Sequence, residues 1–136
     1  MISIDKLMRL TGLVCGQINK PFRWGYMDCN ILVAAANDIL TGRKTLHKIY
    51  GKYNDYRSAI KFQKNYLSAS QYLHMNGWQK ITDKEVQDGD VLLVDDKHFS
   101  RAHVVVNGNV WSVHEEFGVC AANISAMPEY THWRLK

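Results

Sequence analysis

Apolar residues recur with a helical period in the first half of the chain and with a strand period in the second half. A helix over residues 4–18 is predicted from apolar positions at helical spacing, namely Ile4, Leu7, Met8, Val14 and Ile18. Asn19-Lys20-Pro21 ends this helix, because proline cannot continue the hydrogen-bond ladder. Cys15 falls beside the apolar stripe, and we expect it to be a small, buried residue without chemistry.

The next predicted helix has clear signals at both ends. Asp28 is a favourable N-cap, and Gly42 is a favourable first residue beyond the C-terminus. The apolar positions between them recur at helical spacing and predict a buried helix: Leu32, Ala35, Ala36, Ile39 and Leu40. Two further helices are predicted over about Tyr56–Tyr66 and Ala69–Asn76.

The second half of the chain is typical of an antiparallel sheet. Strands are predicted over Asp90–Asp95, Ala102–Val106, Val110–His114, Gly118–Ala122 and Thr131–Leu135. The Asn-Gly pair at 107–108 lies between β-branched runs and indicates a hairpin. Helices followed by antiparallel strands predict an α+β domain, with N-terminal helices packed on a C-terminal sheet.

The composition fits one globular domain over residues 1–136. Hydrophobic residues make up 46% of the chain and aromatic residues 11%, which excludes a disordered chain. The start of the chain has no pattern of a secretory signal, so we expect synthesis in a cytoplasm and no membrane insertion. The longest apolar run, Ile31 to Ala36, is too short to span a bilayer.

The net charge of +4 is unevenly distributed. Between residues 43 and 64, Asp55 is the single acid among seven basic residues: Arg43, Lys44, Lys48, Lys52, Arg57, Lys61 and Lys64. This stretch is either a solvated face or a surface for an anionic partner, such as a wall polymer, an acidic protein or nucleic acid. Nucleic acid ranks last, because no motif that reads it is present.

Cys29 is the strongest candidate for chemistry among the three cysteines. It follows the predicted N-cap directly, where free amide groups and the helix dipole favour a thiolate. The alternative is a structural cysteine in the core. The odd number of cysteines does not indicate a disulfide framework, and the absence of a Cys-x-x-Cys pair argues against a zinc ribbon.

Two of the six histidines lie on the arms of the predicted hairpin. With Gly108-Asn109 as the loop, His103 lies opposite His114; with Asn107-Gly108 as the loop, His103 faces Ser112 and His114 is a diagonal neighbour. Either turn places both imidazoles on one face, which makes them candidates for a base and its orienting partner. The remaining four histidines are expected to be exposed or to have their hydrogen bonds satisfied, without a role in chemistry: His47, His74, His98 and His132.

Zinc binding is a competing interpretation of the same residues. Cys29, His103 and His114 could supply three ligands of a catalytic zinc with an open fourth position. The sequence lacks a close ligand pair such as His-x-His, so this interpretation ranks below nucleophilic catalysis.

Residues 21–33 resemble the nucleophile motif of NlpC-type cell-wall cysteine peptidases: a proline, an aromatic residue, a spacer, a second aromatic residue, glycine, a variable stretch, Asp-Cys and an apolar helix. They read Pro21-Phe22-Arg23-Trp24-Gly25-Tyr26-Met27-Asp28-Cys29-Asn30-Ile31-Leu32-Val33. The run Asp88–Leu93 resembles the strand entry before the family's histidine, and Ala102–Val106 resembles the histidine strand. The resemblance covers most of residues 21–115. It is closest to compact single-domain variants that resemble bacteriophage tail proteins.

This resemblance implies a papain-like fold and hydrolysis of amide bonds in peptidoglycan stem peptides, without a cofactor. Cys29 would be the nucleophile, His103 the base and His114 the orienting residue. Substrate-binding candidates are Trp24, Tyr26 and Asp28, with core packing as the alternative for the two aromatic residues. The expected partners are peptidoglycan peptides and phage tail-tip proteins, and the expected location is the virion tail. The alternative function is a non-catalytic part of a tail tip or baseplate.

Overall fold

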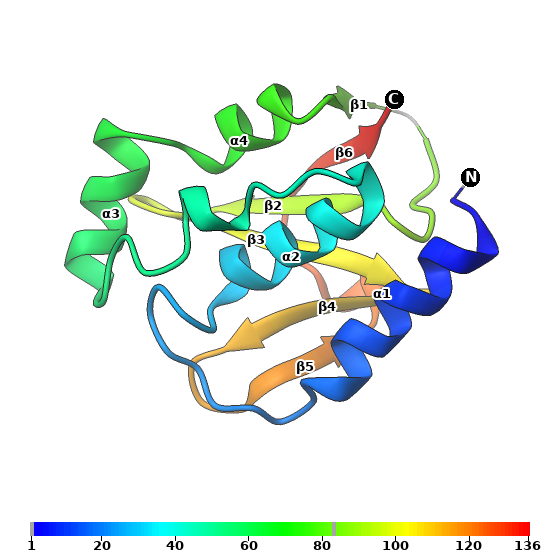
Figure 1. The fold of residues 1–136 in the computed structure, drawn as a ribbon, viewed down its shortest axis with the longest axis horizontal. Coiled ribbons are helices and arrows are strands. Elements are labelled where there is room, and N and C mark those ends of the chain that lie inside the picture. The colour runs from blue at the N-terminus through cyan, green and yellow to red at the C-terminus, as the bar shows by residue number, and fades with distance from the viewer. Residues whose placement is uncertain (1, 83) are drawn as a thin grey trace.

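Helices and strands occupy separate layers of the molecule (Figure 1). The computed structural model describes residues 2–82 and 84–136. Its helices are α1 (Ile4–Gly16), α2 (Cys29–Thr41), α3 (Tyr56–Asn65) and α4 (Ala69–Met75), with short 3-10 turns at η1 (Leu46–Lys48) and η2 (Ile124–Ala126). Its strands are β1 (Trp78–Ile81), β2 (Val91–Asp95), β3 (Ser100–Val106), β4 (Asn109–His114), β5 (Gly118–Ala122) and β6 (Thr131–Leu135).

The six strands form one antiparallel sheet in the order β1-β6-β2-β3-β4-β5. The expected α+β arrangement is therefore confirmed, with the four α-helices before the strands in the chain. Helix α2 packs mainly on β3 and β4, and the large core lies between the helices and the sheet. Within the described residues, no helix combines the length and hydropathy needed to cross a membrane.

Helix α2 forms as its cap signals predict. The Asp28 side chain accepts a hydrogen bond from the Ile31 amide, and Gly42 closes the helix in the left-handed conformation, with φ 74°. Nine of its thirteen residues are buried, so the helix lies in the core as expected. The predicted helices at 56–66 and 69–76 are also confirmed, to within one residue at their ends.

The buried face of α1 differs from the predicted stripe. Leu10 and Val14 are buried, whereas Ile4, Met8 and Ile18 are 78%, 68% and 52% exposed. The two core-facing residues, Leu10 and Val14, are thus four positions apart, and the predicted stripe mixed residues from two faces of the helix. Cys15 is exposed, so the expectation that it is buried was wrong.

Strand β1 was absent from the sequence-based prediction. Only Trp78 of its four residues is buried, so the segment has too little alternation to indicate a strand. The Trp78 indole donates to the Asn37 side chain of α2 at 2.8 Å, which ties this edge of the sheet to the buried helix.

The face of the sheet away from the helices carries a smaller apolar core. Leu92, Val105 and Val110 form it, and the β5–β6 connection covers it with Ile124 and Met127. This second layer leaves part of β3, β4 and β5 open beside it, where the candidate site lies.

A tight loop before α2 depends on Gly25. Arg23 and Met27 pair across it, with the Met27 amide donating to the Arg23 carbonyl at 2.8 Å. Gly25 has φ 81°, and a Cβ atom there would lie 1.8 Å from the Tyr53 carbonyl oxygen. A side chain at this position therefore requires the backbone to move.

Gly25→Ala should lower the free energy of unfolding by more than about 1 kcal/mol, because it combines a positive φ with a backbone clash. The matched control is Gly12→Ala in α1, where a new Cβ meets nothing within 4 Å. That change should raise stability by roughly 0.5–1 kcal/mol. Urea unfolding measures both, and a Gly25→Ala protein as stable as the wild type would contradict the role of this loop.

Candidate active site

Asp28 fixes the chain on both sides of Cys29. One carboxylate oxygen accepts from the Gly25 amide at 2.9 Å, and the other accepts from the Ile31 amide at 2.9 Å. The side chain is fully buried, and burial raises the pKa of Asp28 above its ordinary value despite these hydrogen bonds. Asp28 does not line the cavity described below, so its place in the structure is that of a positioning residue.

Cys29 is the first residue of α2 and is 1% exposed. Burial, followed by the charge of Asp28, raises the pKa of the Cys29 thiol to about 12, although the Ala102 amide and the charge of Arg101 act in the opposite direction. The thiol is therefore protonated at neutral pH in this arrangement. Within residues 2–82 and 84–136 the Cys29 amide has no backbone or side-chain acceptor, so it is free to donate.

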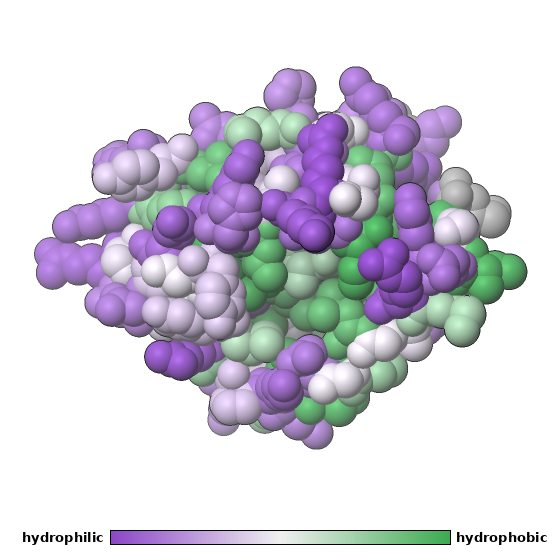
Figure 2. All heavy atoms as spheres, viewed as in Figure 1, coloured by the Kyte–Doolittle hydropathy of each residue, from purple (hydrophilic) through white to green (hydrophobic). Residues whose placement is uncertain are grey.

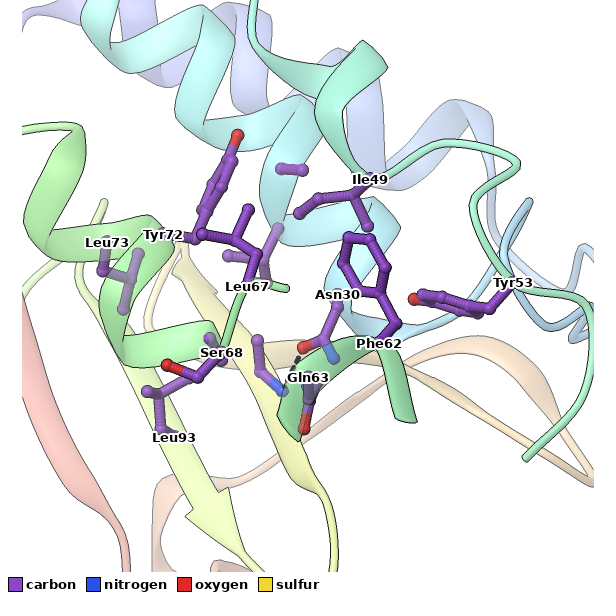
Figure 3. Close-up of a pocket in the computed structure, with 14 residues that line it drawn as sticks. Asn30, Ile49, Tyr53, Phe62, Gln63, Leu67, Ser68, Tyr72, Leu73 and Leu93 are labelled. Carbon is purple, nitrogen blue, oxygen red and sulfur yellow. Dashed lines mark hydrogen bonds between the residues drawn. The ribbon is translucent and has the colours of Figure 1, made fainter. Parts of the chain in front are cut away.

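Asn30 docks the start of α2 onto β3. Its side-chain amide donates to the Ser100 carbonyl at 3.1 Å. Its oxygen accepts from the Ala102 amide at 3.1 Å, the bond drawn as a dashed line in Figure 3. From α3, Gln63 donates to the Ser100 carbonyl at 3.0 Å and accepts from the Ser100 amide at 2.8 Å. Two side-chain amides thus take the place of a neighbouring strand along this part of β3.

Strands β3 and β4 separate where Asn30 and Gln63 bind. The backbone pairing runs from Val106–Asn109 to Val104–Trp111, although both strands continue beyond it. At the point of separation the Ser112 hydroxyl donates to the Ala102 carbonyl at 3.1 Å. The hairpin loop is Asn107-Gly108, with φ of 53° and 78°, as one of the two predicted turns requires.

The separation of the strands brings residues from both faces of the sheet to one cavity of about 470 Å³. Cys29 reaches it from the helix side, and His103, Ser112 and His114 reach it from the hairpin. A cavity of this size falls within the range of ligand sites. The remaining lining residues are Arg101, Val110, Val113, Glu115, Cys120, Ala121, Ala122 and Met127.

His103 is held by a backbone carbonyl. Its Nδ1 atom lies 3.3 Å from the Leu92 oxygen, which places the proton on Nδ1 and leaves Nε2 as the acceptor. Burial is the main cause that lowers the pKa of His103 below 6.5. The imidazole is therefore neutral at pH 7, as a general base must be.

His114 lines the same cavity but makes different contacts from those predicted. Its Nδ1 atom accepts from the Glu116 amide at 3.0 Å, and its ring stacks on Phe117 with centroids 4.9 Å apart. This fixes the proton on Nε2. Among the described residues no hydrogen bond joins His114 to His103 or His103 to Cys29. The predicted hydrogen bond from His103 to His114 is replaced by the one from Nδ1 of His103 to the Leu92 carbonyl.

Trp24 and Tyr26 lie outside the cavity lining. Trp24 is half-buried in an aromatic cluster, 5.6 Å from Phe99 and 5.4 Å from Tyr56 between ring centroids. Tyr26 lies 5.2 Å from Tyr50, with the Arg23 guanidinium 4.2 Å above its ring. Tyr26 therefore packs away from the cavity, whereas the Trp24 ring lies 6.0 Å from the guanidinium carbon of Arg101, which lines it.

The other titratable clusters do not join this site. His132 is buried and lies 2.6 Å from Asp90, which also receives two hydrogen bonds from Arg134. Although burial opposes them, these hydrogen bonds lower the pKa of Asp90. In the part of the chain that the structure describes, no three histidine, cysteine or carboxylate side chains are placed to hold a metal ion.

A second recess lies between α2, α3 and α4 (Figure 3). Tyr53, Phe62 and Tyr72 are among its lining residues, and its volume of about 20 Å³ has room for a single water molecule. It is therefore too small to be a substrate site.

Sequence reasoning missed Asn30, Gln63 and Arg101 as parts of this region. Asn30 carried a usable signal, because a polar side chain in the first turn of a buried apolar helix needs a hydrogen-bond partner. Gln63 and Arg101 had no such signal, since their contacts join segments far apart in the chain.

Comparison with family models matches residues 6–134 to a domain of unknown function, DUF6950. The search of curated proteins finds no match.

The lowered pKa of His103 makes stability depend on pH. As the pH falls from 7 to 5.5, the unfolded imidazole binds a proton near its ordinary pKa of 6.5, while the folded imidazole, whose pKa is lowered by burial, binds a proton to a smaller extent. The free energy of unfolding should therefore fall over this range, and it should fall less in His103→Gln. Urea unfolding at both pH values measures the difference. An equal loss in the two proteins would contradict the burial of this imidazole.

Proposed function

The chain belongs to the DUF6950 family, and we propose that it is an NlpC-like cysteine hydrolase of a bacteriophage tail. Its substrate would be an amide bond in peptidoglycan stem peptides. The observation that carries the proposal is the shared cavity, which is lined both by a cysteine at a helix N-terminus and by a neutral histidine held by a backbone carbonyl. The resemblance of residues 21–115 to NlpC-type peptidases supplies the reaction class and a papain-like fold.

The proposed reaction begins with proton transfer from the Cys29 thiol to Nε2 of His103. The thiolate then attacks the amide carbonyl carbon, and the Cys29 backbone amide donates to the oxygen that becomes negative. His103 returns the proton to the leaving amine as the carbon–nitrogen bond breaks. Water, activated by the same imidazole, hydrolyses the thioester and restores the thiol.

The electrostatics of the site favour a general-base mechanism over a preformed ion pair. The pKa of Cys29 is raised and that of His103 is lowered, so both groups are neutral before substrate binds. A thiolate of high pKa is also a stronger nucleophile once formed. The chemical step therefore requires His103 and Cys29 to come into hydrogen-bond contact in the substrate complex, as catalytic pairs often do only then.

In this proposal the Leu92 carbonyl orients His103, and His114 serves as a donor. The Glu116 amide bonds to Nδ1 of His114, so its Nε2–H is the group available to the cavity. An N–H donor there suits a substrate carbonyl. His114 is thus proposed to bind the substrate carbonyl and not to orient His103.

The basic stretch suits a tail protein that meets the cell wall. All seven basic residues between 43 and 64 are exposed. Hydrophilic side chains cover the end of the molecule where α3 lies (Figure 2). Such a surface would bind an anionic wall polymer or an acidic tail-tip neighbour.

A structural role in the tail tip is the second candidate function. It is favoured by the burial of Cys29, whose pKa of about 12 describes an unreactive thiol, and by the absence of a hydrogen bond to His103 among the described residues. Phage parts of this kind would use the fold without turnover.

Digestion of purified peptidoglycan distinguishes the two candidates. The wild-type protein should release muropeptides with new amino termini, and Cys29→Ala should reduce release to background, because the nucleophile is lost. Cys120→Ala is the matched control, since Cys120 lines the same cavity without a proposed role. Release that is equal in Cys29→Ala and wild type, or no release by either protein, would refute the hydrolase proposal.

A further inference from the structure

Arg101 carries the one permanent positive charge among the described residues that line the cavity. It lies on β3 two residues before His103, so both side chains leave the strand on the same face. Its side chain is 31% exposed, and the guanidinium therefore lies at the mouth of the cavity and not in the core.

Only some of the N–H groups of the Arg101 guanidinium have a partner. One terminal nitrogen, Nη2, donates to Glu115 at 3.1 Å, and Nε lies 3.6 Å from Asp96. The other terminal nitrogen, Nη1, has no partner within residues 2–82 and 84–136. Both carboxylates are about half exposed, at 54% and 41%, and such surface ion pairs exchange readily with water or another anion.

The Arg101 guanidinium lies near the faces of two aromatic rings. The guanidinium carbon is 6.0 Å from the Trp24 ring centroid and 5.7 Å from that of Phe99. The charge of Arg101 also lowers the pKa of both Cys29 and His103, so it acts on the two proposed reacting groups. A ligand held by Arg101 would thus lie beside the bond to be cleaved.

We propose that Arg101 binds a carboxylate of the substrate next to the scissile amide. Glu115 occupies this place in the free protein, and the substrate carboxylate replaces it. A planar guanidinium suits a carboxylate because two N–H groups donate in parallel. The inference rests on the proposed function and deepens it: the substrate class is an anionic peptide, with its charge beside the reacting carbonyl.

Competition between two alkylating reagents of similar size tests this site without requiring turnover. Iodoacetate carries a carboxylate and iodoacetamide a neutral amide, and both alkylate cysteine by displacement of iodide. We define the preference ratio as the rate with iodoacetate divided by the rate with iodoacetamide, measured at Cys29 by peptide mass spectrometry. Cys15 on α1 is exposed and provides the reference within the same molecule.

Arg101→Gln should lower the preference ratio at Cys29 by roughly tenfold or more and leave the ratio at Cys15 unchanged, because a hydrogen-bonded ion pair is lost. Arg101→Lys should give an intermediate value, since it keeps the charge without the planar fork. Glu115→Gln should raise the ratio, because it frees the guanidinium. A ratio at Cys29 that stays within twofold in Arg101→Gln would overturn the proposal.

A binding measurement covers the case in which Cys29 reacts with neither reagent. N-acetylglycine should shift the Arg101 side-chain Nε–H and the Ala102 and His103 amide signals in NMR spectra, and N-acetylglycinamide should not. Arg101→Gln should abolish the amide shifts. Equal shifts with both compounds would refute the carboxylate site. Carboxylate binding without peptidoglycan cleavage would refute the hydrolase proposal alone.

Discussion

The structure of the site depends on the hydrogen bonds that the backbone of β3 makes where β4 separates from it. Backbone groups that lose a strand partner inside a protein need other partners. Here the Asn30 and Gln63 side chains bond to Ser100 and Ala102, and the Ser112 hydroxyl bonds to the Ala102 carbonyl. Because these groups replace the missing strand, the hairpin can open without leaving buried amides unpaired. The same bonds hold the first turn of α2 against the opening.

The opening places a thiol from the helix face and an imidazole from the opposite face at one cavity. A continuous sheet would separate Cys29 from His103 by a layer of backbone. The site is buried on the thiol side, and burial raises the pKa of Cys29 and lowers that of His103. Arg101 is the charge that opposes the first of these shifts. Its position at the mouth links the electrostatics of the proposed reacting pair to the proposed choice of substrate.

Local sequence signals predicted those parts of the fold that are decided by neighbours in the chain. Asp28 and Gly42 marked α2 to the residue, and Asn107-Gly108 marked the hairpin. The separation of β3 and β4 was not predictable in this way, because it depends on Asn30 and Gln63 meeting Ser100 across 70 and 37 residues. For the same reason the pairing rule placed His103 and His114 together, while the structure gives each imidazole its own backbone partner. On α1, Ile4 and Met8 were wrongly predicted to face the core, because exposed apolar residues are common on protein surfaces.

In the proposed mechanism, the opening in the sheet makes His103 the base for Cys29. The rate of Cys29 alkylation by iodoacetamide at pH 7, relative to Cys15 and Cys120, tests it directly. Exposure alone predicts that Cys15 reacts fastest and buried Cys29 slowest. If His103 acts as the base for the thiol, Cys29 should react faster in the wild type than in His103→Gln, while the rates at Cys15 and Cys120 stay unchanged. Reaction of Cys29 at the same slow rate in wild type and His103→Gln would contradict this role of His103.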